Sequence, residues 1–100
     1  MRIKSNKLRK SAKGQECQVR LPGVCSWDDS QTVLAHVGKD SGMGMKASDI
    51  EATFACGNCH AVMDGQVNHN FERDFVRLAM LEGAERTRAI WVEQGLIQVK

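Results

Sequence analysis

The sequence predicts a small α+β domain that is clamped by one structural metal ion. The chain has 100 residues, and four of them are cysteines. A fold of this length buries only about two-thirds of its unfolded surface, so a bound metal commonly supplements the core. Two short apolar runs, at 32–37 and 50–55, precede a longer segment with helical spacing over 71–94. Short strands followed by helices in this order indicate an α+β arrangement.

The four cysteines form two arms that are separated by thirty residues: Cys17-x7-Cys25 and Cys56-x2-Cys59. Two thiolates at x2 spacing curl around one ion, and two such arms give the four-sulfur set of structural zinc. Pro22-Gly23 supplies the turn that the longer arm requires. Free buried thiols, a disulfide or a redox pair remain alternatives.

The N-terminal residues are charged, and no apolar run follows them as it would in a secretory signal. No segment of the sequence is long and apolar enough to span a bilayer. The expected compartment is therefore a reducing cytoplasm, where paired cysteines more often bind metals than form disulfides. No membrane partner is expected.

The basic side chains are concentrated at the N-terminus. Residues 1–20 carry seven basic side chains and one acid, whereas the other eighty carry seven basic and eleven acidic side chains. Residues 1–13 show no apolar periodicity, so they are predicted to be a flexible basic arm, and 14–100 to be a single domain. A basic arm suits a polyanion such as nucleic acid, although a merely solubilising tail is the alternative.

The apolar runs 32–37 and 50–55 contain β-branched residues and are predicted to be strands. A glycine-containing segment without periodicity, 38–49, is predicted to be a loop between them. A short helix is expected over 60–64, and Gly65 would end it.

Asn70 is the predicted N-cap of the C-terminal helical segment. Gly83 is expected to kink this segment or to split it in two, and Gly95 to end it. A final short strand is predicted over 96–99. The arginines of the segment alternate with acids and are predicted to lie on solvated faces: Arg73, Arg77, Arg86 and Arg88.

If four thiolates fill the zinc site, His60 and Asp64 are left for another purpose. Their i, i+4 spacing places an imidazole and a carboxylate on one face of a helix. A simple hydrogen bond along that helix is the alternative interpretation. His36 ends a predicted strand between the two zinc arms, so closure of the zinc site would bring it towards this pair. Three converging polar groups indicate metal-assisted hydrolysis, whereas a lone histidine in an apolar run would be a core residue.

The order of these motifs resembles the HNH (His-Me finger, ββα-metal) endonucleases with an added zinc ribbon. The resemblance rests on C-x7-C, on LAH at 34–36 and on C-x2-C-H-x3-D at 56–64. Most of the chain, roughly residues 9–99, is similar to the small prophage-encoded nucleases of the YbcO type. The segments that carry this similarity are RKSAKGQECQVRLPGVC, TVLAH, CGNCHAVMD and LEGAERTRAIWVEQGLI.

The resemblance implies a zinc-stapled ββα-metal core with an added C-terminal helical segment. It implies that His36 is the general base and that His60 and Asp64 bind the catalytic ion, while the four cysteines bind structural zinc. Asp49 lies near the position of the family's central Asn, which shapes the loop and orients the base. The implied substrate is DNA, and the implied setting is the cytoplasm of a bacterial host, with phage recombination or packaging proteins as further partners.

Ala35 departs from the family pattern, because many HNH enzymes have a metal-binding Asp or His just before the general base. The catalytic ion would then have two protein ligands, which suits Mg²⁺ or Mn²⁺ because such ions keep several waters. Zn²⁺ is the alternative ion. Two alternative functions follow: a non-catalytic zinc module, or a degenerate nuclease fold, that binds DNA or a protein partner. The oligomeric state is left open.

Overall fold

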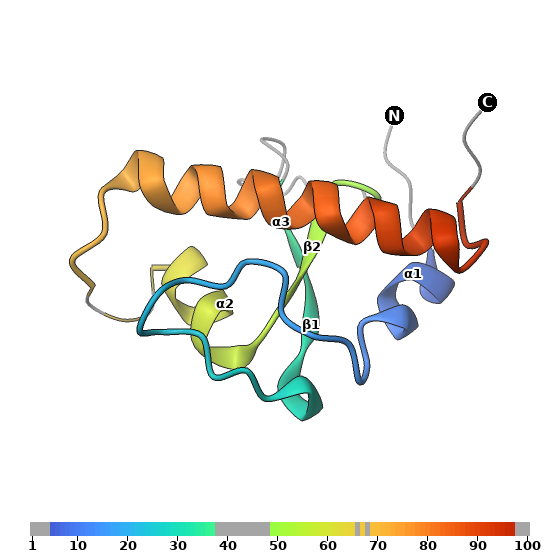
Figure 1. The fold of residues 1–100 in the computed structure, drawn as a ribbon, viewed down its shortest axis with the longest axis horizontal. Helices are drawn as coiled ribbons and strands as arrows, with labels where there is room; N and C mark the ends of the chain where they lie inside the picture. Colours follow the sequence, from blue (N-terminus) through green and yellow to red (C-terminus); the bar gives the residue numbers. More distant parts are fainter. Residues whose placement is uncertain (1–4, 38–48, 66, 68, 98–100) are drawn as a thin grey trace.

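The structure is a computed structural model, and it describes residues 5–37, 49–65, 67 and 69–97. A two-stranded sheet and a short helix lie against one side of a long helix (Figure 1). The elements in chain order are α1 (Asn6–Ser11), the 3-10 helix η1 (Asp29–Gln31), β1 (Val33–His36), β2 (Ala52–Ala55), α2 (Gly57–Met63) and α3 (Arg73–Glu93).

The two predicted strands form an antiparallel pair, which confirms the strand predictions with slightly shorter bounds. Val33 pairs with Ala55 and His36 with Ala52, and the Val37 amide continues the ladder to the Glu51 carbonyl at 2.8 Å. Side chains alternate across the sheet, so Leu34 and His36 share one face while Ala35 faces the other. Of the predicted loop over 38–49, residues 38–48 lie outside the described residues, and Asp49 lies in a turn.

Each face of the sheet packs into its own hydrophobic cluster. On the Leu34 face, Phe54 meets Trp91 of α3 edge-on, with ring centroids 5.9 Å apart. On the Ala35 face lie the cysteines, together with residues from α2 and the first part of α3. Consequently α2 packs beneath the N-terminal half of α3, and α1 packs beneath its C-terminal end (Figure 1).

The long helix is continuous through Gly83, so the predicted kink or split is wrong. A Cβ atom at this position would lie 2.5 Å from Thr53 Oγ1 and 3.1 Å from the Gln18 carbonyl oxygen. The glycine therefore lets α3 approach β2 closely rather than interrupting the helix. Nearby, the Phe54 amide donates to Thr87 Oγ1 at 3.0 Å, which joins the strand to the helix directly.

The prediction of a flexible arm over 1–13 is wrong for residues 6–11, which form α1. Ser5 caps this helix, because its Oγ accepts from the Leu8 amide at 3.3 Å. Leu8 and Ala12 are buried against Trp91, whose Nε1 donates to Ser11 Oγ at 2.7 Å. Leu8 and Ala12 are four residues apart and lie on one face of the helix. Packing of this one apolar pair against the rest of the fold is enough to stabilise so short a helix.

The helix ends differ in detail from the sequence prediction. Helix α2 begins at Gly57 rather than at residue 60, because Cys56 caps it by accepting from the Cys59 amide. The N-cap of α3 is Glu72 rather than Asn70. Gly65 and Gly95 follow their helices at φ of +70° and +72°, as the predicted stops require.

Of the predicted C-terminal strand, Leu96 and Ile97 form no strand, and 98–99 lie outside the described residues. The Leu96 amide donates back to the Trp91 carbonyl at 2.9 Å, so this segment folds onto the helix end instead. Within the described part of the chain, none of the helices combines the length and the apolar character that crossing a bilayer demands.

Candidate functional site

The four cysteines converge at one point, as their spacing predicts. Their Sγ atoms all lie within 4.8 Å of one another, and none is in a disulfide. The turn at Pro22-Gly23 brings Cys25 back towards Cys17, with the Cys25 amide bonded to the Leu21 carbonyl at 2.9 Å. The other two sulfurs come from the start of α2, where Cys56 and Cys59 are fully buried.

The donor set fits a tetrahedral zinc ion. Zn–S bonds of about 2.3 Å give sulfur–sulfur edges of about 3.8 Å. The Sγ atoms of Cys25 and Cys56 are 3.9 Å apart. The amides of Ser26 and Cys59 both donate to Cys56 Sγ at 3.4 Å, and such bonds favour a thiolate.

The four cysteines differ in pKa because the thiols share protons through hydrogen bonds, which favour the thiolate of one cysteine and the protonated thiol of another. The hydrogen bond from Cys59 lowers the pKa of Cys17 to about 4, and the same bond raises the pKa of Cys59. Burial raises the pKa of Cys25 to about 11. For Cys56, burial acts to raise the pKa, but the amides of Cys59 and Ser26 outweigh it and lower the pKa. A divalent cation relieves this sharing, since metal-bound thiols lose their protons.

A second arrangement is centred on Asp49, whose carboxylate is only 1% exposed. One oxygen, Oδ1, lies 2.7 Å from His36 Nε2. The other, Oδ2, accepts from the Ser5 amide at 2.6 Å and from Arg9 Nε at 3.0 Å. Helix α1 and the end of β1 are thus joined through one buried carboxylate.

Hydrogen bonds keep Asp49 ionised in this position. Burial acts to raise its pKa, but the bonds from Ser5, His36 and Arg9 outweigh burial and hold the pKa below its usual value. An ionised carboxylate can only accept, so Nε2 of a neutral His36 carries the ring proton. Its Nδ1 then carries the lone pair, which no hydrogen bond from the described residues occupies, and the side chain is 31% exposed.

The predicted pair on α2 is also formed. His60 Nε2 lies 3.2 Å from Asp64 Oδ2, and the two side chains are 38% and 46% exposed. Asp64 is the C-cap residue of α2, so the pair lies along the last turn and a half of the helix. Both groups are accessible to solvent and to a ligand.

The three groups singled out in the sequence do not form one preformed ligand cluster. Among the described residues, the four cysteines are the only group of three or more potential ligands gathered closely enough to hold an ion. His36 instead pairs with Asp49, and His60 pairs with Asp64. Ala35 is buried in the cluster that contains the cysteines and supplies no further ligand.

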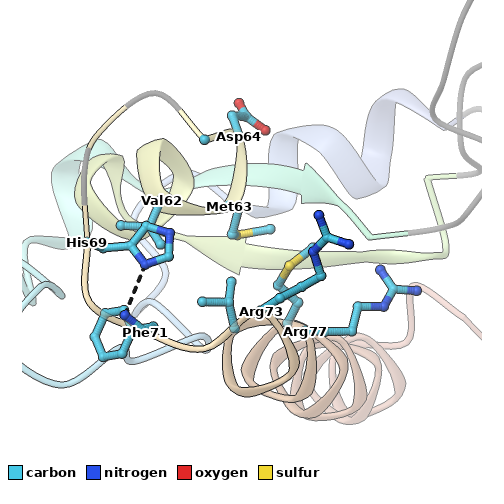
Figure 2. Close-up of a pocket in the computed structure, with 10 residues that line it drawn as sticks. Val62, Met63, Asp64, His69, Phe71, Arg73 and Arg77 are labelled. Atoms are coloured by element: carbon cyan, nitrogen blue, oxygen red, sulfur yellow. Dashed lines mark hydrogen bonds between the residues drawn. The ribbon is translucent and has the colours of Figure 1, made fainter.

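A groove of about 510 Å³ lies between the end of α2 and the start of α3 (Figure 2). Asp64 and Arg77 are among the residues that line it. Arg77 Nη1 donates to the Val37 carbonyl at 2.8 Å, which connects the groove to the end of β1 next to His36. The two histidine–aspartate pairs therefore belong to elements that border one region.

Several residues that hold this region together do not have the role that the local sequence predicts. Arg77 and Arg86 do not lie on purely solvated faces, because both donate to backbone carbonyls of other segments, and Arg86 Nε bonds to the Gln18 carbonyl at 3.2 Å. Arg9 is not part of a flexible arm, because it bonds to Asp49 forty residues away. No local pattern signals such pairings, because each depends on the tertiary fold.

Comparisons with known proteins agree over nearly the whole chain. A family model described as "Putative nuclease YbcO" matches residues 6–96. The "Putative nuclease YbcO" of Escherichia coli (strain K12) is 42% identical over 93 residues, which cover 91% of this chain and 96% of that protein. The protein of that name from Enterobacteria phage 82 matches with the same identity and coverage.

A solved structure shares the fold. It is described as a putative bacteriophage protein from Escherichia coli str. K-12 substr. MG1655, and it superposes with a TM-score of 0.76 at 40% identity. The match covers 89% of this chain and 100% of that one. The range matched by the family model contains the four cysteines and both histidine–aspartate pairs.

Proposed function

Because the chain belongs to the family described as "Putative nuclease YbcO", we propose that it is a metal-dependent endonuclease of the HNH type. Its substrate is DNA, and the reaction is hydrolysis of a phosphodiester bond. The observation that carries this proposal is the His36–Asp49 pair, in which a buried carboxylate holds a partly exposed imidazole. A packed core histidine would have no need of an open ring nitrogen.

His36 acts as the general base in this proposal. With its Nε2 proton bonded to Asp49, the ring takes a proton from the attacking water at Nδ1. Asp49 orients the ring and stabilises the imidazolium that forms, as a buried carboxylate does in other Asp–His pairs. Arg9 and the Ser5 amide keep Asp49 in place.

His60 and Asp64 are the proposed ligands of the catalytic ion. An imidazole nitrogen and a carboxylate oxygen on one exposed helix face suit Mg²⁺ or Mn²⁺, with Zn²⁺ as the alternative. Such an ion supplies stabilisation for charge that develops on the phosphate and on the leaving oxygen. Ala35 adds no ligand, so water and substrate complete the coordination.

The four cysteines are proposed to bind a structural zinc ion that clamps segment 17–25 to the start of α2. The phage and bacterial relatives favour a role in phage DNA metabolism in the host cytoplasm. There the protein acts alone or beside recombination or packaging proteins.

The test is nicking of supercoiled plasmid by zinc-loaded protein with Mg²⁺, Mn²⁺ or EDTA, with the zinc content measured after each reaction. Cleavage should require a divalent ion. It should fall by about a hundredfold or more in His36→Ala, because general bases typically contribute 10²–10⁴-fold. Val33→Ala, an exposed change on the same strand, is the matched control and should keep full activity.

A second function is favoured by Ala35 and by the finding that, among the described residues, the two pairs form no single ligand cluster. This function is a zinc module that binds DNA or a protein without cleaving DNA. The same experiment separates the two functions. If folded, zinc-loaded protein nicks no plasmid with any of these ions, the nuclease proposal is wrong and the binding module replaces it.

A further inference from the structure

The groove between α2 and α3 is built of two different kinds of surface. Its floor is apolar and includes Val62, Met63, Val76 and Met80, whereas its rim carries charged and polar groups. Ligand pockets commonly have roughly 300–1,000 Å³ of volume, apolar walls and a few placed polar groups. At about 510 Å³ the groove falls within that range.

One side of the groove ends in a column of three aromatic rings. Phe71 stacks on Phe75 with centroids 5.3 Å apart and planes 10° apart, and His69 lies 5.7 Å from Phe71 at 33°. The Phe71 amide donates to His69 Nδ1 at 3.1 Å, which fixes the imidazole at the end of the column. His69 and Phe71 line the groove, and His69 is exposed, so its ring offers the column a free end.

The other side carries two cations. Figure 2 shows Arg73 and Arg77 across the groove from His69 and Phe71, with Met63 between the two sides. Arg77 is held by its bond to the Val37 carbonyl, and Arg73 is exposed. Two guanidinium groups that face an aromatic column suit a ligand with both a flat ring and a negative charge.

We propose that this groove binds an unpaired nucleotide of the DNA strand beside the cleaved bond. The base stacks on His69 at the end of the ring column, and Arg73 and Arg77 contact the adjacent phosphates. This inference rests on the proposed nuclease function for its position, because Asp64 borders both the groove and the proposed ion. A base within a continuous duplex is already stacked on both sides, so the site selects gapped or single-stranded DNA.

The test measures binding in a His36→Ala background, where the DNA stays intact. Fluorescence anisotropy compares a continuous duplex, the same duplex with a short gap, and a single strand, all at one salt concentration. Gapped and single-stranded DNA should bind about tenfold more tightly than the duplex, and His69→Ala should remove most of that preference. His69→Phe should keep it, because stacking needs a ring and not an imidazole.

Two further variants separate stacking from charge. Arg73→Ala should weaken binding and lower the salt slope by about one, as expected for one lost phosphate contact. Leu81→Ala and Arg88→Ala are matched apolar and charge controls on α3 outside the groove, and both should leave the preference unchanged. All of these positions are partly or fully exposed, so folding is expected to survive.

The inference is overturned if His69→Ala weakens duplex and single-strand binding equally, or changes neither. Absence of DNA binding by the parent protein also overturns it, and points to an apolar segment of a protein partner as the occupant. The outcome is independent of catalysis: selective binding of unpaired DNA by a protein that never cleaves would support the groove site and refute the nuclease.

Discussion

At the scale of single residues, the two oxygens of Asp49 have different partners, and this division makes one substitution informative. In Asp49→Asn the Ser5 backbone amide and the Arg9 guanidinium still need an acceptor, so both bind the side-chain oxygen of the asparagine. Its side-chain nitrogen then faces His36. His36 Nε2 must then accept, and the ring proton moves to Nδ1, where it blocks the uptake of a proton from water. We expect cleavage to fall by about a hundredfold or more while the fold is kept.

The tautomer of His36 is the readout that separates this effect from simple damage. Nitrogen-15 NMR of the imidazole should show the proton on Nε2 in the parent protein and on Nδ1 in Asp49→Asn. A variant that shows the shifted tautomer but cleaves at the parent rate would contradict the assignment of His36 as the base.

The lowered pKa of Asp49 also predicts how stability depends on pH. The carboxyl has a lower pKa in the folded chain than the value of about 3.9 in an unfolded one. Its contribution is therefore fully present above about pH 4 and is lost as the pH falls through the folded-state pKa. The parent protein should exceed Asp49→Asn in free energy of unfolding at pH 6, and the difference should shrink in acid.

Urea unfolding of both proteins, at pH 6 and at steps below pH 4, measures this difference. A metal bound by the four cysteines would also be released in acid, but that loss would be common to both proteins and would cancel in the comparison. A difference in stability that stays constant with pH would show that the Asp49 charge contributes nothing to folding.

At the scale of elements, the contact between α3 and β2 depends on the missing side chain of Gly83. Alanine is the better helix former by about 1 kcal/mol, so an exposed helix would gain from Gly83→Ala. Here the new Cβ would lie 2.5 Å from Thr53 Oγ1, and α3 would have to move away from the strand. We expect a net loss of about 1–3 kcal/mol in the free energy of unfolding, the usual cost of overpacking.

A double-mutant cycle with Thr53→Ala tests the cause of that loss. Removing Oγ1 takes away the nearest contact and leaves the Gln18 carbonyl oxygen at 3.1 Å, so Gly83→Ala should cost less in the Thr53→Ala background. If Gly83→Ala stabilises the protein in either background, the close approach of α3 to β2 is not what this glycine provides.

The same elements show what local sequence can and cannot predict. The strands, the stop at Gly65 and the convergence of four cysteines follow from short patterns that act on their own neighbourhood. Helix α1 and the unbroken α3 do not follow from local patterns, because each depends on a distant partner: Trp91 for Leu8, and Thr53 for Gly83. Tertiary packing overrides local preference at these positions.

The candidate site likewise contains some contacts that local sequence predicts and others that it does not. The His60–Asp64 pair could be predicted because i, i+4 spacing fixes it within one helix. For Asp49 only a resemblance to a family suggested a role, and the bonds to Arg9 and Ser5 could not be foreseen. Those bonds span forty or more residues, and nothing in the spacing of the chain encodes them.

At the scale of the whole molecule, the cysteine site joins segment 17–25 to the start of α2. Segment 17–25 contains no helix or strand, and its residues Val19 and Leu21 are buried in the same cluster as the cysteines. Metal binding at such a site contributes directly to the free energy of folding. A domain of this size is expected to unfold in one step, so loss of the ion should affect both faces of the sheet.

Cys59→Ser should therefore release one zinc per chain and lower the melting temperature by roughly 10 °C or more. Metal analysis and thermal unfolding measure these effects. The fluorescence of Trp91, recorded in a Trp27→Phe background because Trp27 lies two residues from Cys25, reports whether the distant cluster melts with the site. Val92→Ala is the control, because Val92 is exposed on α3 and belongs to neither hydrophobic cluster. If Cys59→Ser kept its metal and its melting temperature, the cysteines would be four packed thiols. The segment 17–25 would then be held by its apolar contacts and by its hydrogen bonds to β2, α2 and α3, such as that from the Gln18 amide to the Phe54 carbonyl at 2.8 Å.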